Sequence, residues 1–283
     1  MKKILVTGKN GQVGTELAML QMAFKEFEFH FTSRKELDIT SEYSVNDFFS
    51  KHTFDYVLNC AAYTAVDKAE AEIELAFAAN EKAVRLLASA AEKQAAFFVH
   101  LSTDYVFDGS HNLPYIENDS VNPLGIYGKS KLAGENILKD FENHSMIIRT
   151  SWVYNSTGSN FLKTMLRLFN ERPEVRVVDD QIGSPTYAGD LARIILQILK
   201  KHQGQSGIFH LSNEGVCSWY DFAKSIADLK KSTAQIRPIP TSHYPTPAKR
   251  PVFSVLNKSK IKSTFDIEIP HWHDSLIDCI KLL

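Results

Sequence analysis

Short apolar runs rich in β-branched and aromatic residues alternate, over the first half of the chain, with longer segments of helical spacing. This alternation predicts βαβ units and therefore a parallel sheet covered by helices, an α/β fold with a Rossmann-type doubly wound parallel sheet. The runs expected to form strands are KKILVTG, FEFHF, FDYVLNC, AFFVHLS and SMIIRTS, and the longest helical segment between them is EIELAFAANEKAVRLLASAAEKQ.

The pattern changes after about residue 151. Apolar runs become shorter, helical stretches follow one another without regular strand partners, and prolines gather in IRPIPTSHYPTPAKRP. We therefore expect a dinucleotide-binding Rossmann domain over residues 1–151 and a smaller, mainly substrate-binding C-terminal lobe over 152–283. Some segments of the second range are expected to return to the first domain.

Composition excludes several classes of function. In the 283 residues, 32 Lys and Arg nearly balance 33 Asp and Glu, so no basic footprint for nucleic acid or an anionic membrane is present. The first apolar run stops at Gly8, and no other is long enough to span a bilayer, which predicts a cytoplasmic protein. Three scattered cysteines form neither a disulfide framework nor a zinc motif.

A glycine series follows the first predicted strand. Gly8, Gly11 and Gly14 in TGKNGQVG have the spacing GxxGxxG, which suits a tight turn, a close approach of the backbone to a diphosphate, and the start of a helix. In the simpler interpretation of such a motif, the glycines only form a turn between a strand and a helix and bind no ligand. Because the motif lies between an N-terminal strand and an amphipathic segment, a dinucleotide-binding turn is favoured.

The end of the second predicted strand bears on the choice of cofactor. An acid there would bind the ribose 2'-hydroxyl of NAD(H), whereas a basic residue accommodates the 2'-phosphate of NADP(H). The sequence FTSRKELDIT places Ser33, Arg34 and Lys35 before any acid. NADPH is therefore the expected cofactor and NADH the alternative, although Arg34 and Lys35 could also form a solvated loop.

Tyr127 and Lys131 lie four residues apart in YGKSK, at the start of a segment with helical spacing. This spacing brings a phenol and an ammonium to one face of a helix, where the cation would lower the pKa of the phenol from its usual value near ~10. The strand end HLSTDYVFDG supplies the hydroxyls of Ser102 and Thr103 at the same edge of the sheet. Together these residues predict an acid and base site for a carbonyl or alcohol.

Over nearly its whole length the chain resembles, in order and spacing of motifs, the dTDP-4-dehydrorhamnose reductases of the extended short-chain dehydrogenase/reductase superfamily. The glycines and YxxxK are shared across the superfamily, whereas STDYVFDG, RTSWVY and PTPAxRPxxSxL are typical of this reductase branch. The segments that carry the resemblance are TGKNGQVG, NCAAYTAVDKAE, LSTDYVFDG, NPLGIYGKSKLAGE, RTSWVY, NFLKTMLRL, DDQIGSPTYAGDLA and PTPAKRPVFSVLN.

The resemblance implies NADPH-dependent reduction of the C4 keto group of dTDP-4-dehydro-L-rhamnose to dTDP-L-rhamnose, for cell-surface polysaccharide synthesis. It implies that Tyr127 donates a proton, that Lys131 lowers the pKa of Tyr127 and binds the nicotinamide ribose, and that Thr103 holds the carbonyl oxygen. The expected cofactor-binding residues are Gly8, Gly11, Gln12, Val13, Gly14, Ser33, Arg34, Asp38, Ile39, Ala62, Tyr63, Thr64, Tyr127 and Lys131. The expected contacts of the nucleotide-sugar substrate are Thr103, Asp104, Trp152 and Arg250.

Arg250 could instead form a structural ion pair, and Trp152 could belong to the core. Some members of the resembled family are described as dimers bridged by magnesium between carboxylates. Glu16 could serve, but Gly189 stands where a second acid is expected, with Asp190 displaced by one residue, which argues against a magnesium bridge. His271 and His273 have no third ligand nearby in the sequence, so no metal is assigned. A monomer and a homodimer both stay open.

Two other functions stay open at this point. A nucleotide-sugar epimerase or dehydratase would use the same tyrosine and lysine but would keep and recycle its cofactor. A regulatory NADP-binding subunit resembling that of methionine adenosyltransferase would serve as a partner protein, because fold alone does not determine function. The joint presence of Thr103, Tyr127 and Lys131, with no obvious additional partner-binding segment, favours catalysis.

Overall fold

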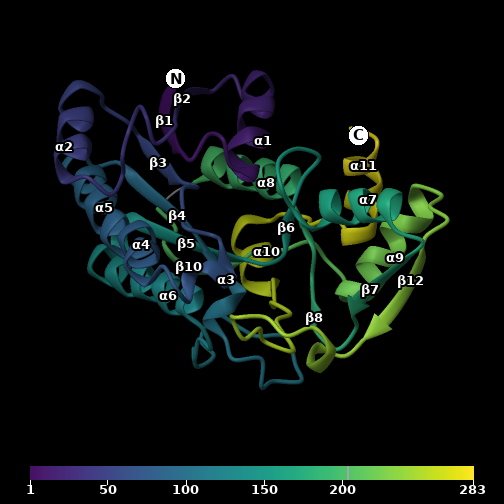
Figure 1. Cartoon of the computed structure of the whole chain (residues 1–283). Helices are drawn as coiled ribbons and strands as arrows, with labels where there is room; N and C mark the ends of the chain where they lie inside the picture. Colours follow the sequence, from purple (N-terminus) through teal and green to yellow (C-terminus); the bar gives the residue numbers. More distant parts are fainter. Residues whose placement is uncertain (203) are drawn as a thin grey trace.

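The computed structural model describes residues 1–202 and 204–283, and six parallel strands form the main sheet of the molecule (Figure 1). Their order is β10-β5-β4-β3-β1-β2, so the chain starts inside the sheet and crosses over toward both edges. This confirms the predicted doubly wound α/β fold. The strands are β1 (Lys2–Thr7), β2 (Phe27–Thr32), β3 (Tyr56–Asn59), β4 (Phe97–Thr103), β5 (Ser145–Thr150) and β10 (Gly207–His210).

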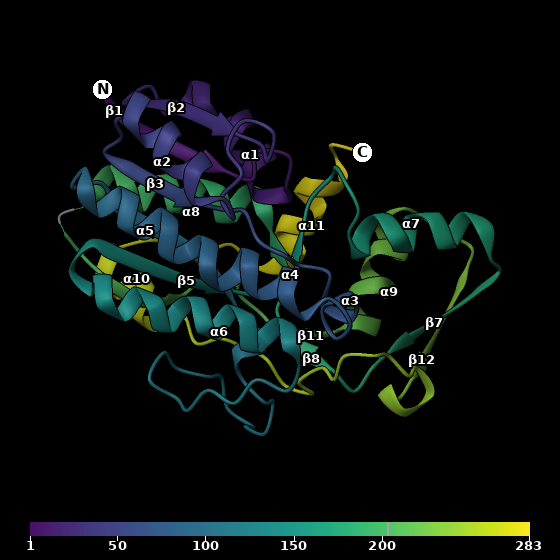
Figure 2. The ribbon, with the colours of Figure 1, turned by 60° about the vertical axis from the view of Figure 1, so that its left-hand side comes forward.

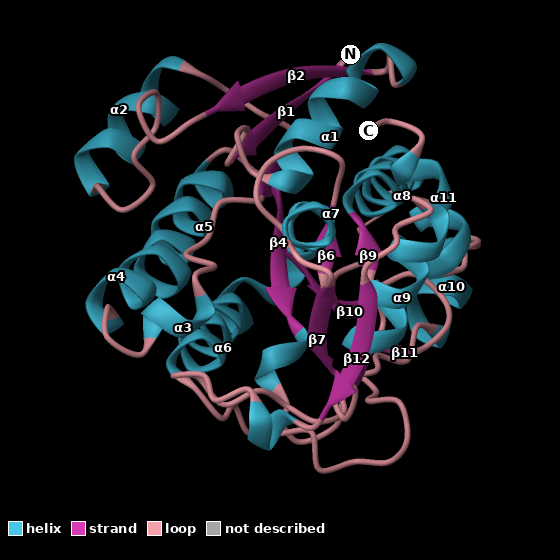
Figure 3. Ribbon diagram, turned by 45° about the vertical axis from the view of Figure 1, so that its right-hand side comes forward, coloured by secondary structure: helices cyan, strands magenta, loops and turns pink. Residues whose placement is uncertain are grey.

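Helices cover both faces of this sheet, and Figure 3 shows them on either side of the strands. On one face lie α1 (Gln12–Leu20), α8 (Ala188–Lys201) and α10 (Ser259–Phe265); on the other lie α2 (Glu42–Lys51), α5 (Ala83–Lys93) and α6 (Ile126–Leu138). Successive residues of a strand point to opposite faces. Ile4 and Val6 of β1 accordingly belong to the core under α1 and α8, whereas Leu5 belongs to the core under α2 and α5.

The longest predicted helical segment is helical throughout but changes pitch in its middle. It comprises α4 (Ile73–Phe77), the π-helical turn η2 (Ala78–Lys82) and α5. The wide turn contains the buried Asn80, whose amide binds both backbone groups of Tyr63 and the hydroxyl of Ser130. Single π turns occur frequently at functional sites, and this one borders the cleft described below. The short helix α3 (Val66–Ala69) precedes α4.

A smaller group of elements lies at the right of Figure 1, and in Figure 2 its members α7, α9, β7 and β12 lie at the right. Here a two-stranded parallel ribbon packs against helices around the ring of Phe222, which contacts the rings of Tyr154, Phe161 and Trp272. The elements of this lobe are α7 (Phe161–Glu171), β7 (Glu174–Val178), α9 (Trp219–Leu229), β12 (Gln235–Ile239) and α11 (Trp272–Ile280).

Short strand pairs and 3-10 turns make up the remaining described elements. β6 pairs with β9 in parallel, and β8 pairs with β11 in antiparallel fashion. The short strands are β6 (Val153–Tyr154), β8 (Ile182–Gly183), β9 (Thr186–Tyr187) and β11 (Cys217–Ser218). The turns are η1 (Gln21–Ala23), η3 (Asp104–Val106), η4 (Lys139–His144) and η5 (Thr241–His243).

The chain passes between the two parts more than once. Residues beyond 152 contribute α8, α10 and the edge strand β10 to the main sheet. The break predicted at 151/152 directly follows β5, and the division into two domains stays a prediction. None of the helices in the described ranges is both long and apolar enough to cross a membrane.

Candidate active site

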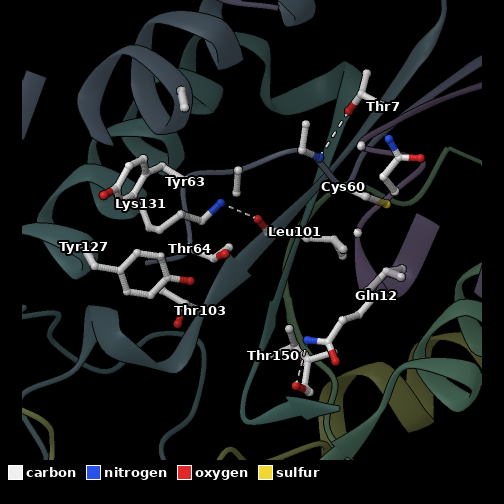
Figure 4. Close-up of a pocket in the computed structure, with 18 of the residues that line it drawn as sticks. Thr7, Gln12, Cys60, Tyr63, Thr64, Leu101, Thr103, Tyr127, Lys131 and Thr150 are labelled. Atoms are coloured by element: carbon white, nitrogen blue, oxygen red, sulfur yellow. Dashed lines mark hydrogen bonds between the residues drawn. The ribbon is translucent and has the colours of Figure 1, made fainter. Parts of the chain in front are cut away.

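A cleft of about 1150 Å³ opens beyond the carboxyl ends of β1, β3, β4 and β5 and extends to the smaller lobe. Ligands of open α/β sheets bind at this edge, where the strand order reverses. Figure 4 shows side chains from several strand ends converging on this cleft, with Thr103, Tyr127 and Lys131 on one side and Gln12 on the other.

The glycine turn between β1 and α1 forms one end of the cleft. Gly8 has a φ of +72°, and a Cβ there would lie 2.8 Å from the backbone nitrogen of Ala61. A Cβ on Gly14 would collide with the carbonyl of Gly8. Helix α1 starts immediately afterwards, so the unpaired N–H groups of its first turn can bind a diphosphate. The residues of this turn that line the cleft include Gly8, Gly11, Gln12 and Val13.

The segment after β2 lines the same end. Ser33, Arg34, Asp38 and Ile39 all border the cleft. The Arg34 side chain is 79% exposed, and its Nε lies 3.7 Å from Asp38 Oδ2. Such an exposed pair contributes little to stability, which leaves the guanidinium able to bind another anion. Hydrogen bonds from Thr40, with Arg34 contributing less, lower the pKa of Asp38.

The loop after β3 lines the side of the cleft between the glycine turn and the residues Tyr127 and Lys131. Ala62, Tyr63 and Thr64, which the family resemblance implied as cofactor contacts, line the cleft here. Asn80 of the π turn holds this loop, since its Oδ1 accepts from Tyr63 N at 2.9 Å and its Nδ2 donates to Tyr63 O at 3.0 Å. The phenol of Tyr63 donates to Glu72 at 2.6 Å.

Thr103, Tyr127 and Lys131 meet at the centre of the cleft. Thr103 is the last residue of β4, whereas Tyr127 and Lys131 lie one turn apart at the start of α6. Gly128 permits the close approach of these elements, because a Cβ there would collide with the carbonyl of Tyr105. The ring of Tyr105 packs edge-on against Tyr127, with 5.5 Å between centroids.

The predicted lowering of the Tyr127 pKa is wrong for this structure. Burial raises the pKa of Tyr127 to about 12, and a hydrogen bond with Thr103 only partly opposes that increase. Lys131 is not turned toward the phenol: its Nζ donates to the backbone carbonyl of Leu101 at 2.6 Å and lies 3.1 Å from His100 Nε2. Burial lowers the pKa of Lys131 to about 8. Tyr127 is therefore a protonated phenol at neutral pH.

Asp104 and Trp152 lie where the cleft meets the smaller lobe. Asp104 is buried, and loss of solvation raises its pKa to about 6. The indole of Trp152 stacks on Trp219 with 3.6 Å between ring centroids and 8° between their planes. Trp152 also has a φ of +48°, an uncommon conformation for a large side chain, which frequently marks a functional position.

Arg250 is placed differently from the other predicted substrate contacts. Its guanidinium forms a two-point ion pair with Asp67, at 2.7 and 3.1 Å, and a hydrogen bond with Thr246. It is not among the described residues that line the cleft. The structural ion pair that the sequence left open for Arg250 is thus present, joining α3 to the proline-rich loop.

Residues 1–283 match the family model described as RmlD substrate binding domain. The chain belongs to this RmlD family. The match spans both the main sheet and the smaller lobe, so every residue of the cleft lies within it.

Curated relatives support membership of the RmlD family. The chain is 41% identical to a dTDP-4-dehydrorhamnose reductase of Aggregatibacter actinomycetemcomitans, covering 98% of this chain and 97% of the relative. It is also 41% identical to the spore coat polysaccharide biosynthesis protein SpsK of Bacillus subtilis, covering 99% of this chain and 98% of the relative.

A solved structure of a dTDP-4-dehydrorhamnose reductase from Bacillus anthracis, in complex with NADP, matches with a TM-score of 0.95 at 37% identity. It covers 100% of this chain and 99% of the other. A UDP-glucose 4-epimerase from Thermus thermophilus, in complex with NAD, also matches, with a TM-score of 0.81 at 18% identity; it covers 99% of each chain. The latter similarity shows a shared fold alone.

Several cleft residues of this RmlD family member were not predicted. Trp219 is the clearest, because it stacks on Trp152 from a helix that starts 67 positions further along the chain. Its signal was the aromatic pair Trp219 and Tyr220 directly after Ser218, a helix-capping serine. The remaining unpredicted residues of the lobe side are Thr150, Ser151, Val153, Thr157, Gly158, Ser159, Asn160 and Phe161.

Glu16 and Asp190, the carboxylates considered for a magnesium bridge, both have partners within this chain. Glu16 is buried, and the phenol of Tyr187 donates to its Oε2 at 3.5 Å. Asp190 is occupied by Arg193 at 2.6 Å and by Asn213 at 2.9 Å, and Gly189 offers no ligand. Whether magnesium bridges two copies of the chain stays a prediction.

Proposed function

We propose that this chain reduces the C4 keto group of dTDP-4-dehydro-L-rhamnose to dTDP-L-rhamnose with NADPH, in the synthesis of cell-surface polysaccharide. The observation that carries this proposal is the convergence of Thr103, Tyr127 and Lys131 in the cleft of a full-length RmlD family member. The similarity to reductases at about 40% identity over nearly the whole chain supports the same substrate class.

The residues along the cleft fit a nicotinamide dinucleotide. We assign the diphosphate to the glycine turn and the start of α1, where N–H groups are available for an anion. Ser33 and Arg34 would bind the phosphate on the adenosine ribose, with Asp38 and Ile39 beside the adenine. The wall of Ala62, Tyr63 and Thr64 would then run along the cofactor toward the nicotinamide, which supplies the hydride when bound.

Tyr127 is the proposed proton donor. As C4 accepts a hydride, negative charge develops on the carbonyl oxygen, and the Tyr127 hydroxyl transfers its proton to that oxygen to complete the alcohol. The raised pKa suits this direction of reaction because it keeps the phenol protonated at neutral pH. The Thr103 hydroxyl would hold the same oxygen, and Lys131 would stabilise the phenolate left behind.

Asp104 and Trp152 are the proposed sugar contacts. The buried Asp104 offers a strong hydrogen-bond acceptor to sugar hydroxyls, and the Trp152 indole offers a flat apolar face to the deoxysugar ring. Arg250 is kept here only as the residue that fixes the proline-rich loop through Asp67. The diphosphate of the substrate is therefore not assigned to it.

The replacement Tyr127→Phe tests the proposal. With NADPH and dTDP-4-dehydro-L-rhamnose, loss of nicotinamide absorbance should slow by at least ~10²-fold in kcat, the usual scale for a general acid. Tyr105→Phe is the matched control, because that ring packs against Tyr127 in the same cleft but is assigned no proton transfer. Turnover by Tyr127→Phe within a few-fold of the wild type would overturn the assignment.

A further inference from the structure

A chain of four buried polar side chains runs beneath the floor of the cleft and joins α6 to the middle of β4 and to the ends of β3 and β1. Lys131 Nζ lies 3.1 Å from His100 Nε2, and His100 Nδ1 lies 3.1 Å from Asn59 Nδ2. Thr7 completes the chain, with 2.6 Å between its Oγ1 and Asn59 Oδ1. All four residues are at most 2% exposed, and the first and last of them also line the cleft.

The donors and acceptors of this chain determine the state of His100. A Lys131 ammonium has three hydrogens to donate and no acceptor, so Nε2 of His100 must be the bare nitrogen and Nδ1 must carry the proton. Nδ1 then requires an acceptor. Turning the Asn59 amide by 180° exchanges its nitrogen and its oxygen, which only their hydrogen-bond partners distinguish. In that orientation Asn59 Oδ1 accepts from His100 Nδ1, and Asn59 Nδ2 donates to the Thr7 hydroxyl.

Burial and the neighbouring cation keep His100 neutral. Both lower the pKa of its imidazole well below its usual value, so at neutral pH it can accept from Lys131. The other titratable or charged groups close to Lys131 are Cys60, Asp104, Tyr127 and Glu135, the last of which is paired with Arg149. In the described contacts, no carboxylate binds the ammonium directly, and neutral acceptors from β4 orient it instead.

We propose that His100 positions Lys131 by presenting Nε2 as a fixed acceptor, an inference that rests on the proposed reductase function. Together with the carbonyl of Leu101, the imidazole holds two of the three ammonium hydrogens. The third is then free to point into the cleft, toward Tyr127 and the site assigned to the cofactor ribose. His100 thus acts through Lys131 without touching the substrate.

A purely structural role for His100 is the competing interpretation, because its ring also lies parallel to Phe98, with 6.3 Å between centroids. Three substitutions separate the two roles. His100→Gln carries an amide oxygen near the place of Nε2 and keeps an acceptor for Lys131. His100→Asn is shorter, reaches only the place of Nδ1, and keeps a contact with Asn59. His100→Phe keeps the volume of the ring but has no acceptor.

The pH dependence of kcat/KM is the decisive readout. Loss of the acceptor destabilises the charged form of Lys131, so the basic limb of the profile, expected near the Lys131 pKa of about 8, should move to lower pH in His100→Asn and His100→Phe. Their kcat should fall by about 10- to 100-fold, the scale seen for partners that orient metal ligands. His100→Gln should retain most of the activity and the wild-type limb.

Thermal unfolding and NADPH affinity, measured on all three variants, identify any that fail to fold. If the basic limb is unmoved in folded His100→Asn and His100→Phe, or if His100→Gln loses as much kcat as His100→Phe, the positioning role is overturned. A wild-type protein that binds NADPH but does not reduce the keto sugar would instead overturn the proposed function, so the two failures are distinct.

Discussion

The ion pair between Glu135 and Arg149 gives a sharp test of how the active-site helix is held. Glu135 lies on α6, one turn beyond Lys131, and its carboxylate accepts from Arg149 Nε at 2.9 Å and Nη2 at 2.7 Å. Ser102 of β4 donates to the same carboxylate at 2.5 Å. The two charged side chains are only 3% and 2% exposed. Glu135 thus links α6 to β5 through Arg149 and to β4 through Ser102.

Replacing Glu135 with Gln keeps the shape of the side chain but leaves the Arg149 charge buried without a counter-ion. Breaking a buried pair in this way costs about 3–5 kcal/mol, a large share of the roughly 5–15 kcal/mol that stabilises a typical domain. In a chain of this length the midpoint of thermal unfolding should fall by roughly 6–10 °C. We expect kcat to fall as well, because Tyr127 and Lys131 lie on α6, the same helix as Glu135.

Urea unfolding of four proteins measures the effect. The double variant Glu135→Leu with Arg149→Met removes both charges and should be less destabilised than Glu135→Gln alone, because no uncompensated charge remains. Glu171→Gln is the matched control. Its partner Arg167 lies at 2.6 Å, but the two side chains are 59% and 48% exposed, so the loss should stay below about 1 kcal/mol. A loss for Glu135→Gln as small as that of the control would refute the reasoning.

Three further substitutions test individual assignments. Thr103→Val should lower kcat more than it lowers stability, measured by steady-state kinetics and urea unfolding; an effect on stability alone would indicate a core role. Arg34→Ala should raise KM for NADPH by about five- to tenfold and leave KM for NADH nearly unchanged, because only the 2'-phosphate meets this exposed guanidinium; equal losses would make Arg34 structural. Asp104→Asn should weaken substrate binding yet stabilise the fold above pH 6 by about 1–3 kcal/mol, since the raised pKa of Asp104 makes its charge costly there. Unfolding below pH 4 should show no such gain.

Periodicity alone predicted five of the six strands of the main sheet. The five predicted runs correspond to β1 to β5. The inner strands β3, β4 and β5 are almost wholly buried and therefore mainly apolar, whereas the edge strand β2 alternates apolar and polar residues. The sixth strand, Gly207–His210, was not predicted, since four residues at an edge carry too little pattern to separate from a loop. Its place depends on pairing with β5, a long-range contact.

Spacing predicted which site residues would meet but not their electrostatic state. Tyr127 and Lys131 share a helix face, as the interval of four residues requires. The direction of the Tyr127 pKa shift was wrong because the phenol loses solvation while the ammonium is turned to β4. Both effects depend on the residues that pack around α6, and neither can be inferred from the motif YGKSK alone.

The aromatic stack of Trp152 on Trp219 shows a second limit. The two indoles come from different parts of the chain, and they meet because α9 packs against α7 and against Tyr154 of β6 in the core of the smaller lobe. A tryptophan after a strand is equally compatible with a core position. The positive φ of Trp152, which makes the placement notable, is a property of the folded backbone.

The fate of the hydride tests the reductase assignment most directly. Purified protein should be incubated with NADPH deuterated at its reactive carbon and with dTDP-4-dehydro-L-rhamnose, and the products followed by nicotinamide absorbance and mass spectrometry. We expect one NADPH oxidised for each dTDP-L-rhamnose formed, with the deuterium at C4 of the sugar. Bound cofactor with an unchanged sugar, or a changed sugar without net loss of NADPH, would contradict the assignment.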